Sequence, residues 1–108
     1  MMKLKTMLNP GWVVALGLAV SAFTGSAQAA DPRAGAKFYN MHCASCHGTR
    51  GKPRMPGVPD FSRGEALFRA DSDLIRSIES GQGVMPAFRG LLSTYEMLDV
   101  IAYLRTLR

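Results

Sequence analysis

The chain is poor in the residues that usually stabilise a small protein. Two of its 108 residues are cysteines, so at most one disulfide can form, and a protein built on several disulfides is excluded. It has a single tryptophan, Trp12, and 8 acidic residues against 13 basic ones, which gives a formal net charge of +5. It lacks the period-two alternation of polar and apolar residues that indicates strands. A hydrophobic share of 47% and a charged share of 19% exclude a disordered or fibrous chain.

The longest apolar run lies near the start of the chain. Two lysines precede the apolar residues 11–20, and Ala27-Gln28-Ala29 follows, which is the order of a secretory signal peptide with a small-residue cleavage site. The run falls short of the roughly 20 residues that a membrane-spanning helix needs. We therefore expect residues 1–29 to be a signal peptide cleaved before Ala30. An uncleaved N-terminal anchor is the alternative.

Cleavage changes the composition of the remaining domain, residues 30–108. It leaves 79 residues (108 − 29), with 11 basic and 8 acidic side chains and no tryptophan. The core of so small a domain contributes only about 3–5 kcal/mol, so we expect a disulfide, a metal or a large cofactor to stabilise it. Export also implies an oxidising compartment, where free thiols rarely persist.

The patterning of the mature chain predicts an all-α fold with long loops. Asp31-Pro32 is a typical helix start, and the first helix is expected to end near residue 43. Glycines and prolines predict a loop over residues 48–63, followed by one short helical turn or more over 64–69. A second helix is expected over residues 71–80, with glycine as its stop. Ser93 and Glu96 form a capping box, which predicts a last helix extending to Leu107.

The motif Cys43-Ala44-Ser45-Cys46-His47 carries the chemistry of the chain. C-x-x-C-H is the attachment sequence for covalent haem c. Cysteines at positions i and i+3 lie on one side of a helical turn, so both thiols can add to the two vinyl groups of one porphyrin edge. His47 follows directly and can place its imidazole under the iron as an axial ligand. The porphyrin would then supply the core that the chain lacks.

The cysteine pair is also compatible with three other kinds of site. A redox-active dithiol usually lies on a βαβ scaffold, and no strands are predicted here. A structural zinc site needs four ligands, and the other nearby candidates, His42 and His47, flank the same short run. A plain disulfide is the third alternative. The export signal, the C-x-x-C-H motif and a downstream methionine together favour haem.

The mature chain resembles the small single-haem c-type cytochromes along its whole length. The attachment motif is highly specific, and the other shared motifs are individually weak but stand in the family's order. The resemblance implies the small cytochrome c fold, with three main helices and long loops around one covalent haem c. Besides the attachment motif, it is carried by Gly35, Tyr39, Pro59-Asp60-Phe61, Met85-Pro86 and Val100-Ile101-Ala102-Tyr103-Leu104.

The sixth ligand of the iron must come from the opposite face of the haem. Met41 and His42 precede the motif on the same helix and cannot easily reach that face, and Met97 lies in the last helix, where a core position is more natural. Met55 follows the motif histidine by only eight residues, whereas Met85 follows it by 38, in a glycine-rich loop between helices. The family places its distal methionine in a Met-Pro loop, so the resemblance implies Met85. Met55 remains the alternative.

A histidine that binds a metal almost always donates its second ring N–H to a partner. In the family a proline carbonyl accepts it, about a dozen residues after the histidine. Pro59 stands 12 residues after His47, so its carbonyl is the expected acceptor, with Pro56 as the alternative. A purely structural role for Pro59 in the turn is the other possibility.

The resemblance also implies that the first and last helices cross. Gly35 and Tyr39 stand at i and i+4 on the first helix, and Val100 and Tyr103 at i and i+3 on the last. A glycine lets a second helix approach closely, and an aromatic side chain covers the gap.

These features predict an exported, periplasmic electron carrier rather than an enzyme, so we assign no catalytic residue. The alternative is an electron-transfer subunit bound permanently to a dehydrogenase or oxidase complex. The expected protein is a monomer with no membrane span after processing, and export excludes nucleic acid as a partner. Arg50, Lys52 and Arg54 follow the motif and could dock an acidic redox partner, although a solvated loop is the plainer interpretation.

Overall fold

The structure, a computed structural model, describes residues 2, 25 and 27–108, so the predicted signal peptide lies largely outside the described residues. These residues form four α-helices, two short 3₁₀-helices and two isolated bridges, with no strand among them. The predicted all-α class is confirmed. Within the described part of the chain, no helix is long and apolar enough to cross a membrane.

Helices α1 (Pro32–His42) and α4 (Thr94–Leu104) begin where the sequence predicts. The Asp31 carboxylate accepts a hydrogen bond from the Arg33 N–H at 2.8 Å, which satisfies one of the free donors in the first turn of α1. At α4 both bonds of the Ser93–Glu96 capping box are present.

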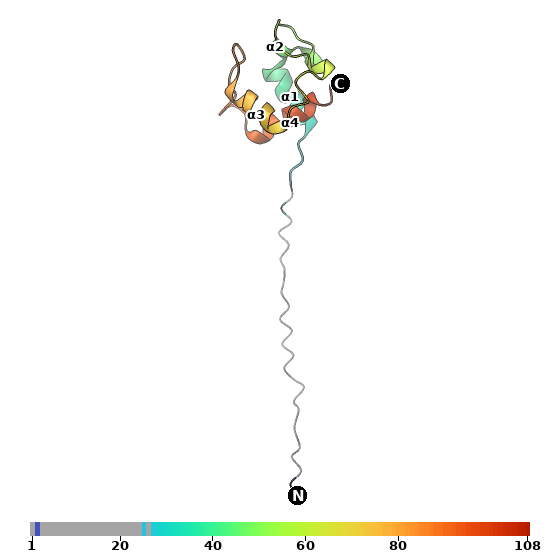
Figure 1. Cartoon of the computed structure of the whole chain (residues 1–108), viewed down its shortest axis with the longest axis vertical. Coiled ribbons are helices and arrows are strands. Elements are labelled where there is room, and N and C mark those ends of the chain that lie inside the picture. The colour runs from blue at the N-terminus through green and yellow to red at the C-terminus, as the bar shows by residue number, and fades with distance from the viewer. Residues whose placement is uncertain (1, 3–24, 26) are drawn as a thin grey trace.

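The two terminal helices cross in close contact (Figure 1). A Cβ atom added at Gly35 would lie 1.9 Å from the Asp99 carbonyl oxygen, so only glycine permits this approach. Beside the crossing, the rings of Tyr39 and Tyr103 are 5.3 Å apart, and Tyr39 packs with Val100 in one buried cluster. The predicted helix crossing is thus present with its predicted residues.

The remaining elements lie between these helices in sequence. They are α2 (Ala44–His47), the 3₁₀-helices η1 (Thr49–Gly51) and η2 (Phe61–Arg63), and α3 (Asp71–Ser80), which is followed by the capping residue Gly81 with φ +66°. The expected loop over 48–63 therefore contains two short 3₁₀ turns.

Helix α4 ends at Leu104, three residues before the predicted end at Leu107. The Thr106 and Leu107 N–H groups donate to carbonyls three residues back, and the Thr106 hydroxyl adds a bond of 2.6 Å to the Tyr103 carbonyl. The last turn tightens for this reason, and such tight turns are common at helix ends.

The hydrophobic core is divided into two clusters rather than one. The first joins α1, η2 and α4, and the second joins the segment before α4 to α4 itself. A small cavity lies between the two clusters and is lined by buried residues of each. The buried members of the first cluster are Tyr39, Phe61, Leu67, Val100 and Leu104, and those of the second are Phe88, Leu92 and Met97.

Candidate functional site

Cys43 marks the break between α1 and α2. Its backbone (φ −119°, ψ −34°) departs from helical values, although its N–H still donates to the Tyr39 carbonyl at 2.8 Å. The His47 N–H then bonds to the Cys43 carbonyl at 2.9 Å. The turn so formed places both thiols of the motif, from Cys43 and Cys46, on one small cavity, where both are free and half-buried.

Burial raises the pKa of the Cys43 thiol to about 11, and the neighbouring Cys46 adds to this rise. Both the apolar surroundings and a second negative charge nearby disfavour a thiolate. Before any attachment, Cys43 is therefore a neutral thiol near pH 7.

His47 is held in a dry environment at the end of α2. It is only 9% exposed, and its ring stacks on Phe61 with centroids 4.9 Å apart and planes inclined by 19°. Burial lowers the pKa of the imidazole because the charged form loses solvation. A neutral imidazole keeps a lone pair free for a metal ion.

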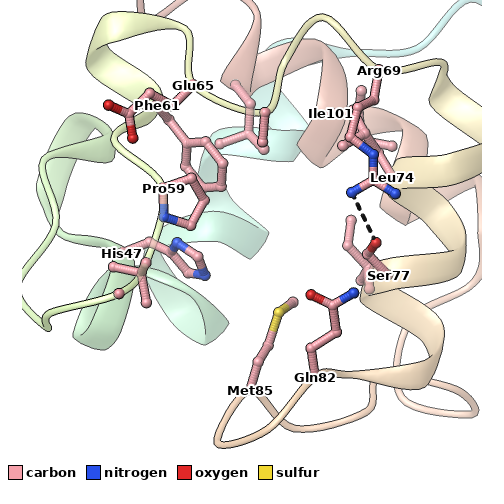
Figure 2. A pocket seen from close by; sticks show the side chains of 15 residues that line it. His47, Pro59, Phe61, Glu65, Arg69, Leu74, Ser77, Gln82, Met85 and Ile101 are labelled. Carbon is pink, nitrogen blue, oxygen red and sulfur yellow. Dashed lines mark hydrogen bonds between the residues drawn. The ribbon is translucent and has the colours of Figure 1, made fainter.

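One buried atom of His47 lacks a partner. Its Nδ1 makes no hydrogen bond to any residue that the structure describes. Figure 2 shows Pro59 beside the imidazole, and Pro59 lines the same cavity, whereas Pro56 is exposed. The predicted bond from His47 to the Pro59 carbonyl is not formed here, and the assignment stays a prediction.

Met85 lies on a tight hairpin after α3. The Gln82 and Met85 backbones exchange two hydrogen bonds, of 3.1 and 2.8 Å. Two further bonds join the segment to the end of α3, from the Phe88 N–H to the Ile78 carbonyl at 3.0 Å and from Arg89 to Glu79 at 3.2 Å. As Figure 2 shows, the Met85 sulfur faces His47 across a gap.

The gap between His47 and Met85 is a cavity of about 510 Å³. That volume is typical of cofactor sites, which span roughly 300–1,000 Å³. The buried neutral imidazole with an unpartnered atom, the facing thioether and the two thiols all suit a covalently bound haem. The apolar lining includes Val58, Phe61, Leu74, Ile78, Ile101 and Leu104.

The other methionines take different positions. Met55 is half-buried and lines the small cavity beside the cysteines, but not the larger one between His47 and Met85. Met97 is 1% exposed in the second core cluster, and Met41 is 71% exposed on α1.

The hydroxyl of Tyr39 has a role that the sequence analysis missed. It donates to the Gly48 carbonyl at 2.6 Å and so ties α1 to the turn directly after His47. Burial raises the pKa of this phenol to about 12. The sequence did hold a sign of this bond, because a tyrosine stands at the helix crossing where a phenylalanine, which has no hydroxyl, would fill the same space. The stacking of Phe61 on His47 was also missed, because no local pattern pairs residues so far apart.

The basic side chains after the motif lie in solvent. Arg50, Lys52 and Arg54 are all exposed, and Arg50 has a positive φ of 59°. These positions are compatible both with a surface that docks an acidic redox partner and with a simple solvated loop.

Sequence comparisons place the chain among known proteins. The family described as cytochrome C oxidase, cbb3-type, subunit III matches residues 30–104. Cytochrome c6 of Nostoc sp. is 34% identical over 97 residues, which cover 84% of this chain and 86% of that protein. The cbb3-type cytochrome c oxidase subunit FixP of Bradyrhizobium sp. is 31% identical over 106 residues, which cover 93% of this chain but only 36% of FixP.

Comparison with solved structures also finds c-type cytochromes. Cytochrome c6 from the diatom Phaeodactylum tricornutum matches with a TM-score of 0.59 and 30% identity, over 70% of this chain and 92% of that one. The c-type cytochrome KustC0563 matches with a TM-score of 0.61 and 27% identity, over 68% and 96%. Taken with the thiol, imidazole and thioether groups around one apolar cavity, these likenesses show that the chain belongs to the small c-type cytochromes, which bind haem c covalently and transfer electrons through its iron.

Proposed function

We propose that the chain is an exported carrier of single electrons in which Cys43 and Cys46 attach the haem and His47 and Met85 bind its iron. The observation that carries this proposal is the facing pair across the cavity: a buried imidazole with a lowered pKa on one side and a thioether on the other. Met85 is favoured over Met55 as the second iron ligand because Met85 lines the larger cavity and faces His47 across it, whereas Met55 does not line that cavity.

When bound, haem c supplies one-electron redox chemistry at its iron. The chain's own residues set the conditions for it. His47 presents a neutral nitrogen, and Met85 presents a soft, uncharged sulfur that favours ferrous iron and raises the reduction potential. The apolar lining excludes water, and low polarity disfavours the extra positive charge of the ferric state. No residue needs to act as an acid, base or nucleophile, which supports a carrier rather than an enzyme.

A direct test uses the purified protein with its haem. We expect a haem that resists extraction by acid and acetone, a reversible one-electron couple, and slow or absent binding of carbon monoxide. Rapid binding of carbon monoxide to the ferrous protein, without methionine ligation, would indicate an open sixth site and a sensor or peroxidase instead.

A second candidate function is a permanent subunit of an oxidase complex. It is favoured by the match to the subunit III family and by the likeness to FixP, of which this chain spans about a third. Size-exclusion chromatography of a native extract separates the two candidates. A free carrier elutes as a small protein, and a subunit co-elutes with a large complex.

Export itself is part of the proposal. The cytochrome c6 relatives, the signal pattern over residues 1–29 and the oxidising chemistry expected of the compartment support a mature chain that begins at Ala30 in the periplasm. Intact mass should equal residues 30–108 plus one haem, and tryptophan fluorescence should be absent because Trp12 is removed. A full-length mass from a membrane fraction would support the uncleaved anchor.

The partners are redox proteins, and we propose Arg50, Lys52 and Arg54 as part of the docking surface. All three are exposed and follow the haem motif directly. Their replacement by glutamine should slow electron transfer with an acidic partner at low ionic strength, while the reduction potential stays the same.

A further inference from the structure

The chain meets α4 at the point where the signal peptide is expected to be removed. Residues 28–31 line a cavity of about 340 Å³ together with Tyr95, Leu98 and Asp99 of α4. Figure 1 shows this segment leading into α1 beside the last helix. Since cleavage is expected before Ala30, the new end of the mature chain lies at this cavity.

A hydrogen bond joins the two segments at this place. The Asp31 N–H donates to the Asp99 carboxylate at 2.7 Å, the short end of the usual range of about 2.7–3.2 Å. The Asp99 backbone is fixed by the helix crossing, because a Cβ atom added at Gly35 would lie 1.9 Å from its carbonyl oxygen. The carboxylate of Asp99 is therefore held beside the start of α1.

The negative charge of Asp99 has no side-chain cation to balance it. The residue is half-buried, and within the described part of the chain no lysine, arginine or histidine nitrogen lies within 4 Å of its carboxylate. A carboxylate that has lost part of its solvation is stabilised by a nearby positive charge. The ion pairs that the described residues do form join Asp73 to Arg76, Glu79 to Arg89 and Asp71 to Arg105.

Removal of the signal peptide creates a cation next to this carboxylate. In the uncleaved chain the Ala30 nitrogen belongs to a neutral peptide bond, and after cleavage it is the α-ammonium group of the mature chain. Ala30 directly precedes Asp31, and neighbouring Cα atoms are about 3.8 Å apart, so the charge arises one residue from the bond to Asp99. We propose that the new α-ammonium group forms an ion pair with Asp99, which strengthens the contact of α1 with α4 only in the processed chain. This inference rests on the cleavage proposed above.

The start of α1 by itself disfavours the new positive charge. The N-terminus of a helix carries a partial positive charge, and α1 begins at Pro32. The carboxylate of Asp31 is already engaged as the helix cap, where it accepts the Arg33 N–H at 2.8 Å. Asp99 belongs to the other helix and adds a second carboxylate, which offsets the charge that processing introduces.

Few other ionisable side chains surround the new terminus. Besides Asp99, the cavity is lined by Asp31 and by Tyr95, which is 70% exposed. The cations of α1, Arg33 and Lys37, are exposed. An ion pair at a half-exposed carboxylate should raise the α-amino pKa by about 0.5 unit above its ordinary value of about 7.7–8.0.

The first test measures this pKa in the mature protein with its haem. The methyl resonance of Ala30 reports the charge of its own amine, and NMR of the reduced protein can follow it from about pH 6 to about pH 10. The α-amino pKa should be about 0.5 unit lower in Asp99→Asn than in wild type. Asp73→Asn removes a carboxylate on α3 that pairs with Arg76, and it should keep the wild-type value. Equal values in wild type and Asp99→Asn would overturn the proposal.

A second test separates the charge from the hydrogen bond. Asp99→Asn also weakens the bond from the Asp31 N–H, so it should lower the denaturation midpoint for that reason alone. Acetylation of the terminal amine, checked by mass spectrometry, removes only the positive charge. Asp99→Asn should therefore lower the midpoint more in the free-amine protein than in the acetylated one. An equal loss in both would leave only the hydrogen bond and reject the ion pair.

The pH dependence has a defined direction. A raised pKa in the folded chain means that the stabilisation is complete below about pH 7 and is lost as the pH rises through the folded value. The difference in midpoint between wild type and Asp99→Asn should thus be larger at about pH 6.5 than at about pH 9.5. A difference that is the same at both pH values would contradict the proposal.

Two measurements on the wild-type protein need no variant. In a crystal structure of the mature protein we expect the Ala30 nitrogen within about 4 Å of an Asp99 carboxylate oxygen, and a greater separation would contradict the ion pair. Intact mass distinguishes this inference from the cleavage on which it rests. A mass of residues 30–108 plus one haem, with an α-amino pKa that Asp99→Asn does not change, rejects the ion pair alone. A full-length mass rejects the cleavage and the ion pair together.

Discussion

His47 and Met85 face one cavity, yet the chain holds them in different ways. His47 ends the short helix α2, which follows α1 after the break at Cys43. Its ring stacks on Phe61, and the next residue, Gly48, is tied to Tyr39. Met85 lies on a hairpin that four backbone hydrogen bonds close and fix to α3. The side of the cavity that carries His47 and the proposed attachment cysteines is therefore held by packed helices (the packed wall), and the opposite side, with Met85, is held by a loop (the loop wall). A loop can be altered without unfolding the domain, so the two proposed iron ligands should respond differently to mutation.

The largest loss of stability should come from a mutation in the packed wall, at one of the two cysteines. Cys46→Ala leaves at most one thioether bond, and we expect it to prevent stable folding, because a mature chain of this size lacks a sufficient core without its cofactor. Far-ultraviolet circular dichroism and haem staining after denaturing electrophoresis measure this. Ser45→Ala, at an exposed position in the same turn, is the control and should behave as wild type. A well-folded, haem-free Cys46→Ala protein with native helix content would contradict the view that haem forms the core.

Removing the methionine side chain from the loop wall should affect iron ligation more than folding. Met85→Ala should abolish the weak ferric band near about 695 nm that sulfur–iron bonds give in this family, lower the reduction potential and admit carbon monoxide. The domain should still fold, because the hairpin bonds of this loop are made by the backbone. Met55→Ala is the matched control and should retain the band. Survival of the band in Met85→Ala with its loss in Met55→Ala would reverse the assignment.

The helix crossing behind the packed wall gives the next test. Gly35→Ala places a Cβ atom against the Asp99 carbonyl, which the backbone cannot avoid without moving the helices apart. We expect a loss of about 1–3 kcal/mol in the free energy of unfolding, measured by chemical denaturation. Lys37→Ala, on the exposed face of α1, should change it by less than about 0.5 kcal/mol. Equal stability of the two variants would mean that α1 and α4 are less closely packed than the structure shows.

The smallest effect concerns a single hydrogen bond on the same wall. Tyr39→Phe removes the bond to the Gly48 carbonyl and should cost about 1 kcal/mol, since this buried acceptor loses one of its two donors and keeps the Gly51 N–H at 3.2 Å. The pKa of Tyr39 is about 12 in the folded chain, above the ordinary value of about 10. Its contribution is therefore complete below pH 10 and is lost as the pH rises toward 12. Denaturation curves from pH 8 to 12 should show a steeper alkaline loss for wild type than for Tyr39→Phe, and parallel curves would remove this role from the hydroxyl.

Features that depend on neighbouring residues could be predicted from the sequence. The helix starts at Asp31 and Ser93, the all-α class and the crossing at Gly35 follow from local signals, namely caps, spacing and the absence of a side chain. The C-x-x-C-H motif likewise encodes its geometry within five residues. Helix α4 was predicted three residues too long, because a tightening last turn leaves no clear mark in an apolar pattern.

Features that depend on distant residues could not be predicted in this way. The stacking of Phe61 on His47 and the placement of Arg69 on the cavity wall arise only once α1, α3 and α4 have packed together. The choice between Met85 and Met55 needed the family resemblance, because both stand in glycine- or proline-rich loops. The cavity lining now favours Met85 on separate grounds.

The contact between the two terminal helices also bears on the order in which the domain is completed. The Asp31 N–H donates to the Asp99 carboxylate at 2.7 Å, across 68 positions of sequence, so α1 finds its partner only near the end of the chain. Contacts between such distant residues form late, because a long segment must first be closed into a loop. Cys43 packs against the cluster that includes Val100 and Leu104. In an exported chain that enters its compartment from the N-terminus, the Cys43 thiol therefore stays uncovered until α4 packs beside it, which leaves time for the haem attachment proposed at this motif.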